Sequence, residues 1–241
     1  IIAYLIAEQV RIFFLYEAYA VFRTSDLLKD KIYAIHNIYR FVGFLDMIVS
    51  VTELRETLPY YCLPGKNSEG ERLRAQAVYH PLIKDCIAND LVLHDKSALI
   101  TGSNMSGKTS FIRTIGINLL AAKVLDTCFA RCFEIDTDLI LLSSIRQNDN
   151  LAEGKSYFMQ EVLTIKDFVN QSNGNCMFLL DELFKGTNTQ ERIAITQAVL
   201  SWLAEKGNLV LTSSHDIELS NLLSNNYKSY HFCEAVKEDV L

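Results

Sequence analysis

Residues 101–110 read TGSNMSGKTS, and this stretch decides the fold. Within it, Gly102–Thr109 fits the phosphate-binding pattern G-x-x-x-x-G-K-[ST]. The apolar run Ala98–Thr101 precedes the pattern, and a helical pattern over 108–123 follows it. A strand before the loop and a helix after it are the context in which such a loop holds nucleotide phosphates. We therefore expect a P-loop NTPase fold.

The residue types of this loop point to phosphate chemistry. Glycines allow the backbone to curl so that its N–H groups, together with the amino terminus of the next helix, face an anion. Lys108 is predicted to reach the β- and γ-phosphates and to support catalysis, and the Thr109 hydroxyl is predicted to ligate Mg²⁺. ATP and Mg²⁺ are the expected cofactors. The predicted nucleotide-binding residues are Gly102, Ser103, Asn104, Met105, Ser106, Gly107, Lys108, Thr109 and Ser110.

A second apolar run, Met177–Asp181, ends in two adjacent carboxylates, Asp181 and Glu182. Carboxylates at that strand end are expected beside the phosphate loop, where Asp181 is a candidate metal ligand and Glu182 a candidate general base. Two acids in this position can also mark the start of a helix, whose dipole favours negative charge. The phosphate loop upstream favours the catalytic interpretation.

The predicted strand Leu209–Ser213 is also followed by polar residues at its carboxyl end, namely Ser214, His215 and Asp216. His215 can donate a hydrogen bond to a γ-phosphate and is a candidate catalytic residue. Alternatively, Ser214 or Asp216 caps a helix that begins at Ile217. The two roles are compatible with each other.

The stretch Gly154-Lys155-Ser156 opens another predicted helix. A helix start of this composition can bind an anion. It can equally be an ordinary capped helix, with Ser156 as the cap and Glu153 nearby. Spacing alone leaves both interpretations open.

Strand and helix patterns alternate after residue 75, which predicts an α/β domain with a mostly parallel sheet flanked by helices. The expected strands are Ala98–Thr101, Leu139–Ile145, Met177–Asp181 and Leu209–Ser213. The expected helices lie near 108–123, 155–170, 188–205 and 216–224.

A helical segment is predicted before this domain, so that residues 1–62 are helical, 63–75 form a linker and 76–241 form the ATPase domain. Ser25 and Asp26 are the expected cap between a helix ending near Phe22 and a second, longer helix. The stretch 1–22 is the most membrane-like, but Glu8, Arg11 and Glu17 interrupt it. We therefore expect a buried helix rather than a membrane span.

Composition limits the classes of partner and compartment. The net charge of −6 provides no basic excess for nucleic acid, so any DNA contact is expected outside this segment or on a local patch. The six cysteines are irregularly spaced, which is typical of reduced thiols in a cytoplasmic protein rather than of disulfides or a metal site. The chain begins within a helical pattern, and we expect it to be part of a longer protein.

Taken together, these motifs resemble the ATPase domain of the MutS family of DNA mismatch-repair proteins over roughly residues 75–235. The phosphate loop TGSNMSGKT, the signature segment NDNLAEGKSYFMQEV, the acidic strand LLDELFKGTNT and the histidine motif TSSHDIEL occur in the family's order. His80-Pro81 also matches a landmark of the family.

The resemblance implies an ABC-type ATPase head that works as a homodimer with composite ATP sites. Ser156 of one subunit would then contact the γ-phosphate bound by the other, and Asn104 would support it within its own subunit. Thr187 and Asn188 would line the seam of the dimer. Nucleotide state would be coupled to DNA, with residues 1–62 at the base of the lever helices.

This sequence departs from the family's pattern in two places. Phe184 and Lys185 stand where the family has a small residue and an arginine, and Cys86 stands where it often has an aromatic residue for adenine stacking. These departures identify a divergent member. The apolar helix at 1–22, the net acidity and Lys185 motivate an alternative function, a nucleotide-gated scaffold or signalling ATPase of MutS-like descent that acts on a partner other than DNA.

Overall fold

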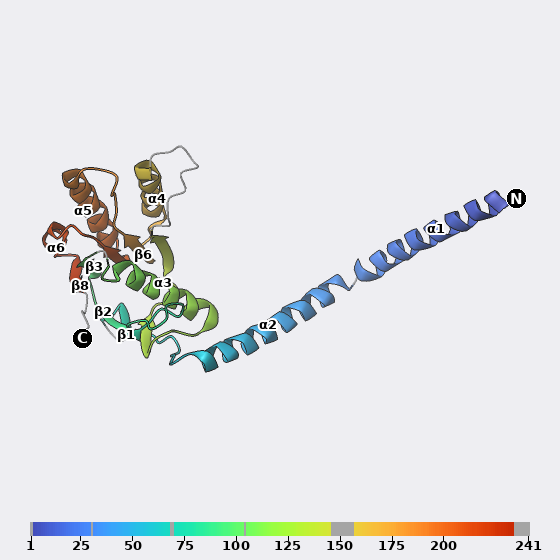
Figure 1. Cartoon of the computed structure of the whole chain (residues 1–241), viewed down its shortest axis with the longest axis horizontal. Coiled ribbons are helices and arrows are strands. Elements are labelled where there is room, and N and C mark those ends of the chain that lie inside the picture. Colours follow the sequence, from blue (N-terminus) through green and yellow to red (C-terminus); the bar gives the residue numbers. More distant parts are fainter. Residues whose placement is uncertain (1, 30, 68–69, 104, 146–156, 234–241) are drawn as a thin grey trace, which may run out of the picture. The chain divides into compact units, whose positions relative to one another are not determined.

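The computed structural model describes residues 2–29, 31–67, 70–103, 105–145 and 157–233. The chain divides into two compact units, Ile1–Thr57 and Leu58–Leu241 (Figure 1). The first unit contains only helices among its described residues, and the second contains all of the strands.

The helical unit consists of α1 (Ile2–Lys29) and α2 (Ile32–Thr57). The prediction that a helix ends near Phe22 and that Ser25 and Asp26 cap the next one is wrong, because α1 continues through both residues. Within the helix, the Asp26 carboxylate forms an ion pair with the Lys29 ammonium at 2.8 Å, one turn further on. This pairing gives Asp26 a role in the helix interior. The second helix begins only at Ile32.

The apolar side chains of both helices are largely exposed. Phe13 and Phe14 of α1 keep more than half of their surface accessible, and α2 contains no buried residue. The expectation of a buried helix at 1–22 is therefore not met, since no described element of this unit covers α1. By length and composition alone, the described helix that could cross a membrane is α2, and core helices and signal sequences pass the same test.

The second unit is built around a five-stranded sheet in the order β5-β6-β7-β3-β8. Its strands are β3 (Ser97–Gly102), β5 (Ile140–Ser144), β6 (Cys176–Asp181), β7 (Leu209–Ser213) and β8 (Tyr227–Phe232). Every neighbouring pair is parallel, which confirms the predicted sheet and α/β class. Strand β8 was not predicted, because its polar residues dilute the apolar signal of a sheet edge.

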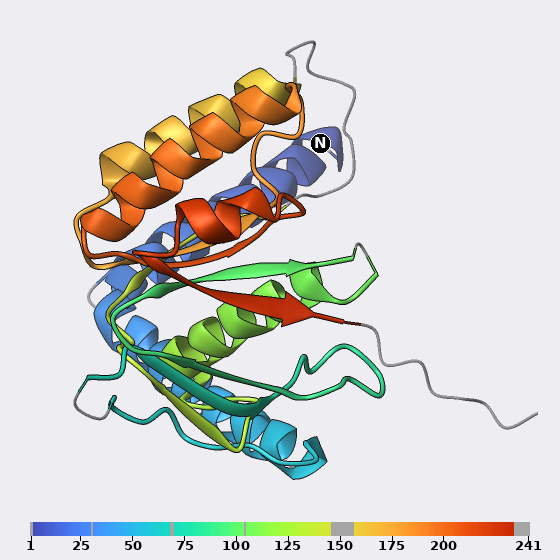
Figure 2. The ribbon, with the colours of Figure 1, turned by 90° about the vertical axis from the view of Figure 1, so that its left-hand side faces the viewer.

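Alternate side chains of the central strands point to opposite faces of this sheet, as strand geometry requires. Met177 and Leu179 of β6 pack with α3 (Lys108–Leu125), whereas Phe178 and Leu180 pack with helices on the other face. Those helices are α4 (Tyr157–Gln171), α5 (Thr189–Glu205) and α6 (Glu218–Leu222). Figure 2 shows α4 and α5 lying side by side on their face of the sheet. In this second unit, α3, α4, α5 and α6 start and end within three residues of the predicted ranges.

A small antiparallel sheet in the order β2-β1-β4 covers the far side of α3. Its strands are β1 (Leu73–Val78), β2 (Asn89–Leu93) and β4 (Cys132–Ile135). This sheet was not predicted, and β1 begins inside the range 63–75 that was expected to be a linker. Gly65, also within that range, pairs with Glu134 of β4. This stretch does contain turn-forming residues. Its pairing with a strand some 60 positions away in the chain leaves no signal in the local sequence, so the pairing could not be predicted.

Asn118 anchors α3, the helix that carries the phosphate loop. Its side chain is buried, donates to the Thr114 carbonyl at 2.9 Å and accepts from the Phe129 N–H at 2.6 Å. The buried N–H of Phe129 therefore depends on this one amide. The hydrogen bond joins α3 to the chain segment that leads into β4.

Replacing Asn118 by Ala should lower the free energy of unfolding by about 2 to 3 kcal/mol, because the Phe129 N–H would be left buried without a partner. Urea denaturation followed by circular dichroism measures this loss. Asn225→Ala, at an exposed turn position, is the control and should change the free energy by less than about 0.5 kcal/mol. Equal stability of the two variants would contradict the anchoring role.

Candidate functional site

Strand register brings the predicted site together at one edge of the large sheet. Asp181 at the end of β6 is paired with Ser213 at the end of β7, and Ile100 near the end of β3 is also paired with Ser213. Because all three strands are parallel, the loops that follow them emerge side by side. The phosphate loop, the acidic pair and the histidine segment therefore meet although they are far apart in sequence.

The phosphate loop adopts a backbone that requires glycine at two positions. Gly102 has a φ of 141° and Gly107 a φ of 88°, both in the region that side chains disfavour. A Cβ on Gly102 would also lie 2.2 Å from the carbonyl oxygen of Phe232 in β8. Gly107 is the N-cap of α3, and no side chain caps that helix. Its first N–H groups therefore remain available to an anion.

Lys108 is folded back into the loop. Its ammonium donates to the carbonyl oxygens of Gly102 at 2.9 Å and Ser103 at 2.6 Å, and the residue is only 2% exposed. Burial lowers the pKa of Lys108, and the negative charge of Asp181 opposes this effect. A cation held by two carbonyl oxygens can exchange them for phosphate oxygens without leaving the loop.

Thr109 and Asp181 are in direct contact. The Thr109 hydroxyl lies 3.0 Å from Oδ1 and 2.9 Å from Oδ2 of Asp181, and the Ser213 hydroxyl donates to Oδ1 of the same carboxylate. Asp181 is 7% exposed. A buried carboxylate beside a hydroxyl is an oxygen donor set that suits Mg²⁺, which keeps several waters and takes few protein ligands. The residues present therefore fit this metal.

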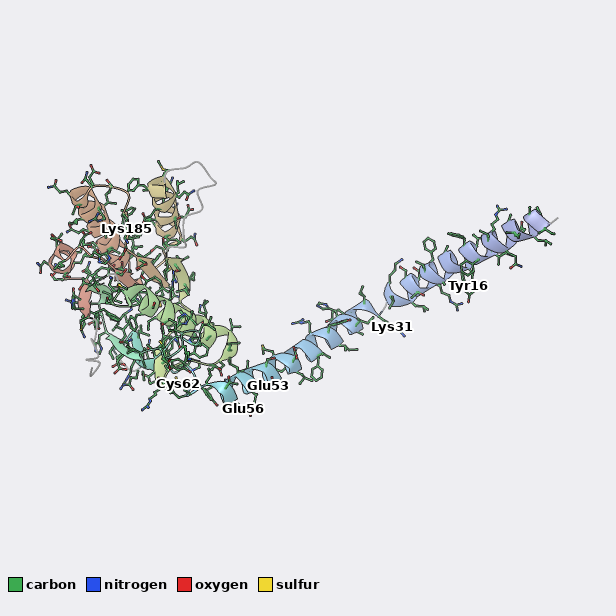
Figure 3. The ribbon with its side chains drawn as sticks, in the orientation of Figure 1. Tyr16, Lys31, Glu53, Glu56, Cys62 and Lys185 are labelled. Carbon is green, nitrogen blue, oxygen red and sulfur yellow. The ribbon has the colours of Figure 1, made fainter. Side chains whose placement is uncertain are left out.

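The Glu182 carboxylate lies between two basic side chains. Its Oε1 contacts Nε2 of His215, and its Oε2 contacts the Lys185 ammonium. Glu182 is 8% exposed and Lys185 is more accessible. Figure 3 labels Lys185 and Cys62, which lie well apart within this unit. The structure thus gives Lys185 a specific contact with the candidate general base.

The hydrogen bonds of His215 fix its tautomer. Nδ1 lies 3.1 Å from the Gly102 carbonyl oxygen, which can only accept, so Nδ1 carries a proton. Nε2 then faces the Glu182 carboxylate. Burial is the largest effect on the pKa of His215 and lowers it, and the charges of Lys108 and Lys185 act in the same direction. The His215 imidazole therefore contacts both the Glu182 carboxylate and the backbone of the phosphate loop.

Asp216 keeps the histidine segment in place. Its carboxylate receives two hydrogen bonds from the Arg192 guanidinium of α5, at 2.8 Å to Oδ2 and 2.6 Å to Oδ1. The pair is mostly buried, and the Arg192 hydrogen bonds lower the pKa of Asp216. The Ser214 hydroxyl accepts from the Asp216 N–H at 3.1 Å. This turn positions His215, whereas α6 begins only at Glu218 and its N-cap has no side-chain hydrogen bond.

The turn after β6 holds two residues in a left-handed conformation. Glu182 has a φ of 51° and Phe184 a φ of 58°, values that residues other than glycine rarely adopt. The Glu182 N–H donates to the Ser213 carbonyl at 3.2 Å, and the Phe184 N–H donates to Oε1 of Glu161 at 2.8 Å. Contacts from β7 and α4 therefore maintain the strained turn that orients Glu182.

A cavity of about 360 Å³ opens beside the phosphate loop. Its wall includes Met105, Ser106, Gly107 and Ser110 on one side and Cys86 and Ile87 on the other, along with Phe111 and Phe232. The Cys86 thiol accepts from the His80 N–H at 3.3 Å, so the His80-Pro81 landmark shapes this wall. A partly apolar cavity next to a phosphate loop is where the base or ribose of a nucleotide would fit.

Two predicted site residues, Asn104 and Ser156, lie outside the described residues, as do Gly154 and Lys155. Met105 is 87% exposed at the tip of the loop. Thr187 and Asn188, predicted at a dimer seam, form the start of α5. The Asn188 side chain caps the helix by accepting from the Glu191 N–H at 2.9 Å, and the Thr187 hydroxyl donates to the Glu191 carboxylate. Their described contacts thus belong to a helix cap.

Comparison with known proteins identifies the family. Residues 98–240, more than half of the chain, match the sequence model of MutS domain V. The chain belongs to the MutS family. It is 30% identical over 209 residues to the DNA mismatch repair protein MutS of Clostridium novyi, covering 82% of this chain and 23% of that protein. It is 30% identical over 208 residues to MutS of Thermus aquaticus, covering 84% and 25%.

A third relative, MutS of Fusobacterium nucleatum, is 27% identical over 225 residues, which covers 90% of this chain and 25% of that protein. The chain thus spans about a quarter of the length of these MutS proteins. The family match runs from Ala98 of β3 through the phosphate loop and the other strands of the large sheet, so it contains Lys108, Asp181, Glu182 and His215.

Sequence reasoning did not find three contributors to the site: Ser213, Arg192 and Glu161. Ser213 touches Asp181 only because the strands β6 and β7 are adjacent. Glu161 left a detectable signal, since it lies on the same helix face as Phe158, Ile165 and Phe168. A carboxylate on an apolar helix face indicates a buried partner. Arg192 left no such signal.

Asp216→Asn should lower the free energy of unfolding by about 1 to 2 kcal/mol at pH 7, because it removes a charged hydrogen-bonded pair. The folded state lowers the pKa of Asp216, so this stabilisation is complete above the ordinary value of 3.8 and is lost as the pH falls through the lowered pKa. Urea titrations of both proteins between pH 7 and pH 3 should show the difference shrinking.

The exposed Asp167→Asn on α4 is the matched control and should follow the wild-type curve throughout this range. A difference for Asp216→Asn that stays constant down to pH 3 would contradict an ionic origin.

Proposed function

We propose that this chain is the ABC-type ATPase domain of a MutS family protein, and that it binds and hydrolyses ATP with Mg²⁺. The observation that carries the proposal is the contact between the Thr109 hydroxyl and both carboxylate oxygens of Asp181, at the sheet edge that also holds Lys108 and Glu182. A hydroxyl from the loop and a carboxylate from a neighbouring strand, beside a buried lysine, are the parts that phosphoryl-transfer sites of this class share.

Binding is assigned to the loop and to the helix that follows it. The uncapped N–H groups of α3 and the Lys108 ammonium provide positive potential for the phosphates. Thr109 and Asp181 would hold Mg²⁺, which when bound neutralises charge on the phosphate oxygens. The cavity lined by Cys86 and Ile87 would take the nucleoside. Since a thiol at this position offers no aromatic ring for stacking, contact with the base would rest on shape and apolar surface.

Hydrolysis is assigned to Glu182 and His215. The Glu182 carboxylate, freed from Lys185, would accept a proton from the attacking water as general base. His215 carries its proton on Nδ1 toward the loop, from where it can donate to a γ-phosphate oxygen. The Arg192–Asp216 pair keeps the imidazole in this orientation. Removal of Lys185 from Glu182 is therefore a condition for turnover.

The wider setting follows from the relatives, which are named as DNA mismatch repair proteins. We propose that the complete protein acts in mismatch repair as a cytoplasmic homodimer, with Ser156 completing the partner subunit's ATP site. DNA would be contacted mainly by other parts of the protein, because this segment carries a net charge of −6. Cys86, Phe184 and Lys185 support its placement as a divergent member.

Lys108→Ala should weaken binding of Mg-ATP by about 30- to 150-fold, since one buried charge-assisted contact to phosphate is worth roughly 2 to 3 kcal/mol. Isothermal titration calorimetry measures the affinity. The matched control, Lys166→Ala, removes an exposed lysine of α4 and should bind as the wild type does. Unchanged affinity in Lys108→Ala would refute the phosphate-loop assignment.

Glu182→Gln should bind Mg-ATP but hydrolyse it about 10²- to 10⁴-fold more slowly, because the amide cannot act as a base. Single-turnover hydrolysis measures the rate, with exposed Glu205→Gln as the control. Light scattering of the same variant reports its mass: dimer formation on adding Mg-ATP is the expected result. ATP binding without hydrolysis in the wild type, and without dimers in the variant, would favour a nucleotide-gated scaffold instead.

A further inference from the structure

The turn that carries Glu182 is maintained by a residue on another element. Glu161 lies in the second turn of α4, is 8% exposed, and accepts the Phe184 N–H on its Oε1 at 2.8 Å. Phe184 is two residues beyond Glu182, and both have a positive φ. A positive φ at such residues persists only where surrounding contacts outweigh the strain.

The turn contacts α4 at more than one point. In this conformation the Phe184 N–H is directed at Oε1 of Glu161. The Phe184 ring is 2% exposed and packs against Phe158 with ring centroids 6.1 Å apart. A Cβ on Gly186 would lie 2.9 Å from Cβ of Phe158, so the turn also approaches α4 closely at its other end.

We propose that Glu161 is a positioning residue for the candidate general base: by holding the Phe184 N–H, it maintains the turn that directs the Glu182 carboxylate into the site. The inference rests on the proposed function for the role of Glu182, but the hydrogen bond and the strained turn exist independently of it. Since Glu161 belongs to α4, a shift of that helix moves the acceptor of Phe184 and with it the turn. The orientation of Glu182 is thus coupled to the position of α4.

The test uses three variants of the chain: Glu161→Ala, which removes the acceptor; Glu161→Gln, whose amide oxygen can still accept; and Asp167→Ala, an exposed carboxylate of the same helix. Hydrogen exchange detected by mass spectrometry, on the peptide that contains Phe184, reports the hydrogen bond directly. We expect exchange at least about tenfold faster in Glu161→Ala. Glu161→Gln and Asp167→Ala should exchange as the wild type does.

Steady-state hydrolysis and ATP affinity separate positioning from general damage. Because a misplaced catalytic group costs up to about 100-fold in rate, kcat of Glu161→Ala should fall by roughly 10- to 100-fold. Its affinity for Mg-ATP, which depends on the loop and not on this turn, should change by less than about threefold. Glu161→Gln should restore kcat to within about threefold of the wild type.

Unchanged exchange and unchanged kcat in Glu161→Ala would overturn the proposal. So would equal losses of ATP affinity and kcat, or a failure of Glu161→Gln to restore either measurement. If the wild-type chain hydrolyses no ATP, the proposed function fails, while hydrogen exchange still decides whether Glu161 maintains the turn. If Glu161→Ala does not fold, Glu161→Met, which keeps most of the side-chain volume but has no oxygen acceptor, replaces it with the same expected and contradicting results.

Discussion

The hydrogen bonds from the Thr109 hydroxyl to Asp181 join residues 72 positions apart in the chain. They form because β3 and β6 are parallel and separated by only β7, so their carboxyl ends lie at one edge. Each other feature of the site builds on that alignment. Ser213 of the strand between them donates to the same carboxylate, and the loop after β7 directs His215 back toward Gly102. A change of one position in the pairing of β6 would separate Asp181 from the hydroxyl groups of Thr109 and Ser213.

The site concentrates buried charge, and the arrangement of that charge explains its resting state. Lys108 is satisfied by carbonyl oxygens, Asp181 by hydroxyl groups, and Glu182 by His215 and Lys185. Buried polar groups are costly unless they are paired, so each needs a partner in the absence of nucleotide. Most of these partners are neutral or flexible. Phosphate can therefore replace them without leaving an unpaired charge in the domain.

Part of the left-handed backbone of this domain lies at the site. Left-handed residues occur at the two glycines of the loop and at Glu182 and Phe184, and outside the site at Ala77, Asp85 and Asp126, whereas the central strands are regular and fully buried. Helices on both faces of the sheet stabilise the positions at the site: α3 through Asn118, and α4 through Glu161 and Phe158. The site is consequently supported by elements on both faces and not by the loops alone.

The sequence by itself determined the class of fold and most of the site. A phosphate loop between a strand and a helix, and polar residues at the ends of apolar strands, are local patterns that predict the parallel sheet and the residues at its edge. Prediction from the sequence failed where a structural feature left no signal in the local residue pattern. Strand β8 and the small sheet of β1, β2 and β4 depend on pairing between distant segments, and the apolar pattern of α1 did not reveal that its side chains are exposed.

Only the tertiary structure decided how the site residues interact. The contact of Glu182 with Lys185 and His215, the Arg192–Asp216 pair and the Glu161 hydrogen bond each join residues whose nearness depends on helix packing and backbone rotation. A sequence reveals the chemical type of a side chain and the face of its element. Its partner is set by how the elements pack in three dimensions, because hydrogen bonds and ion pairs require contact within a few ångströms.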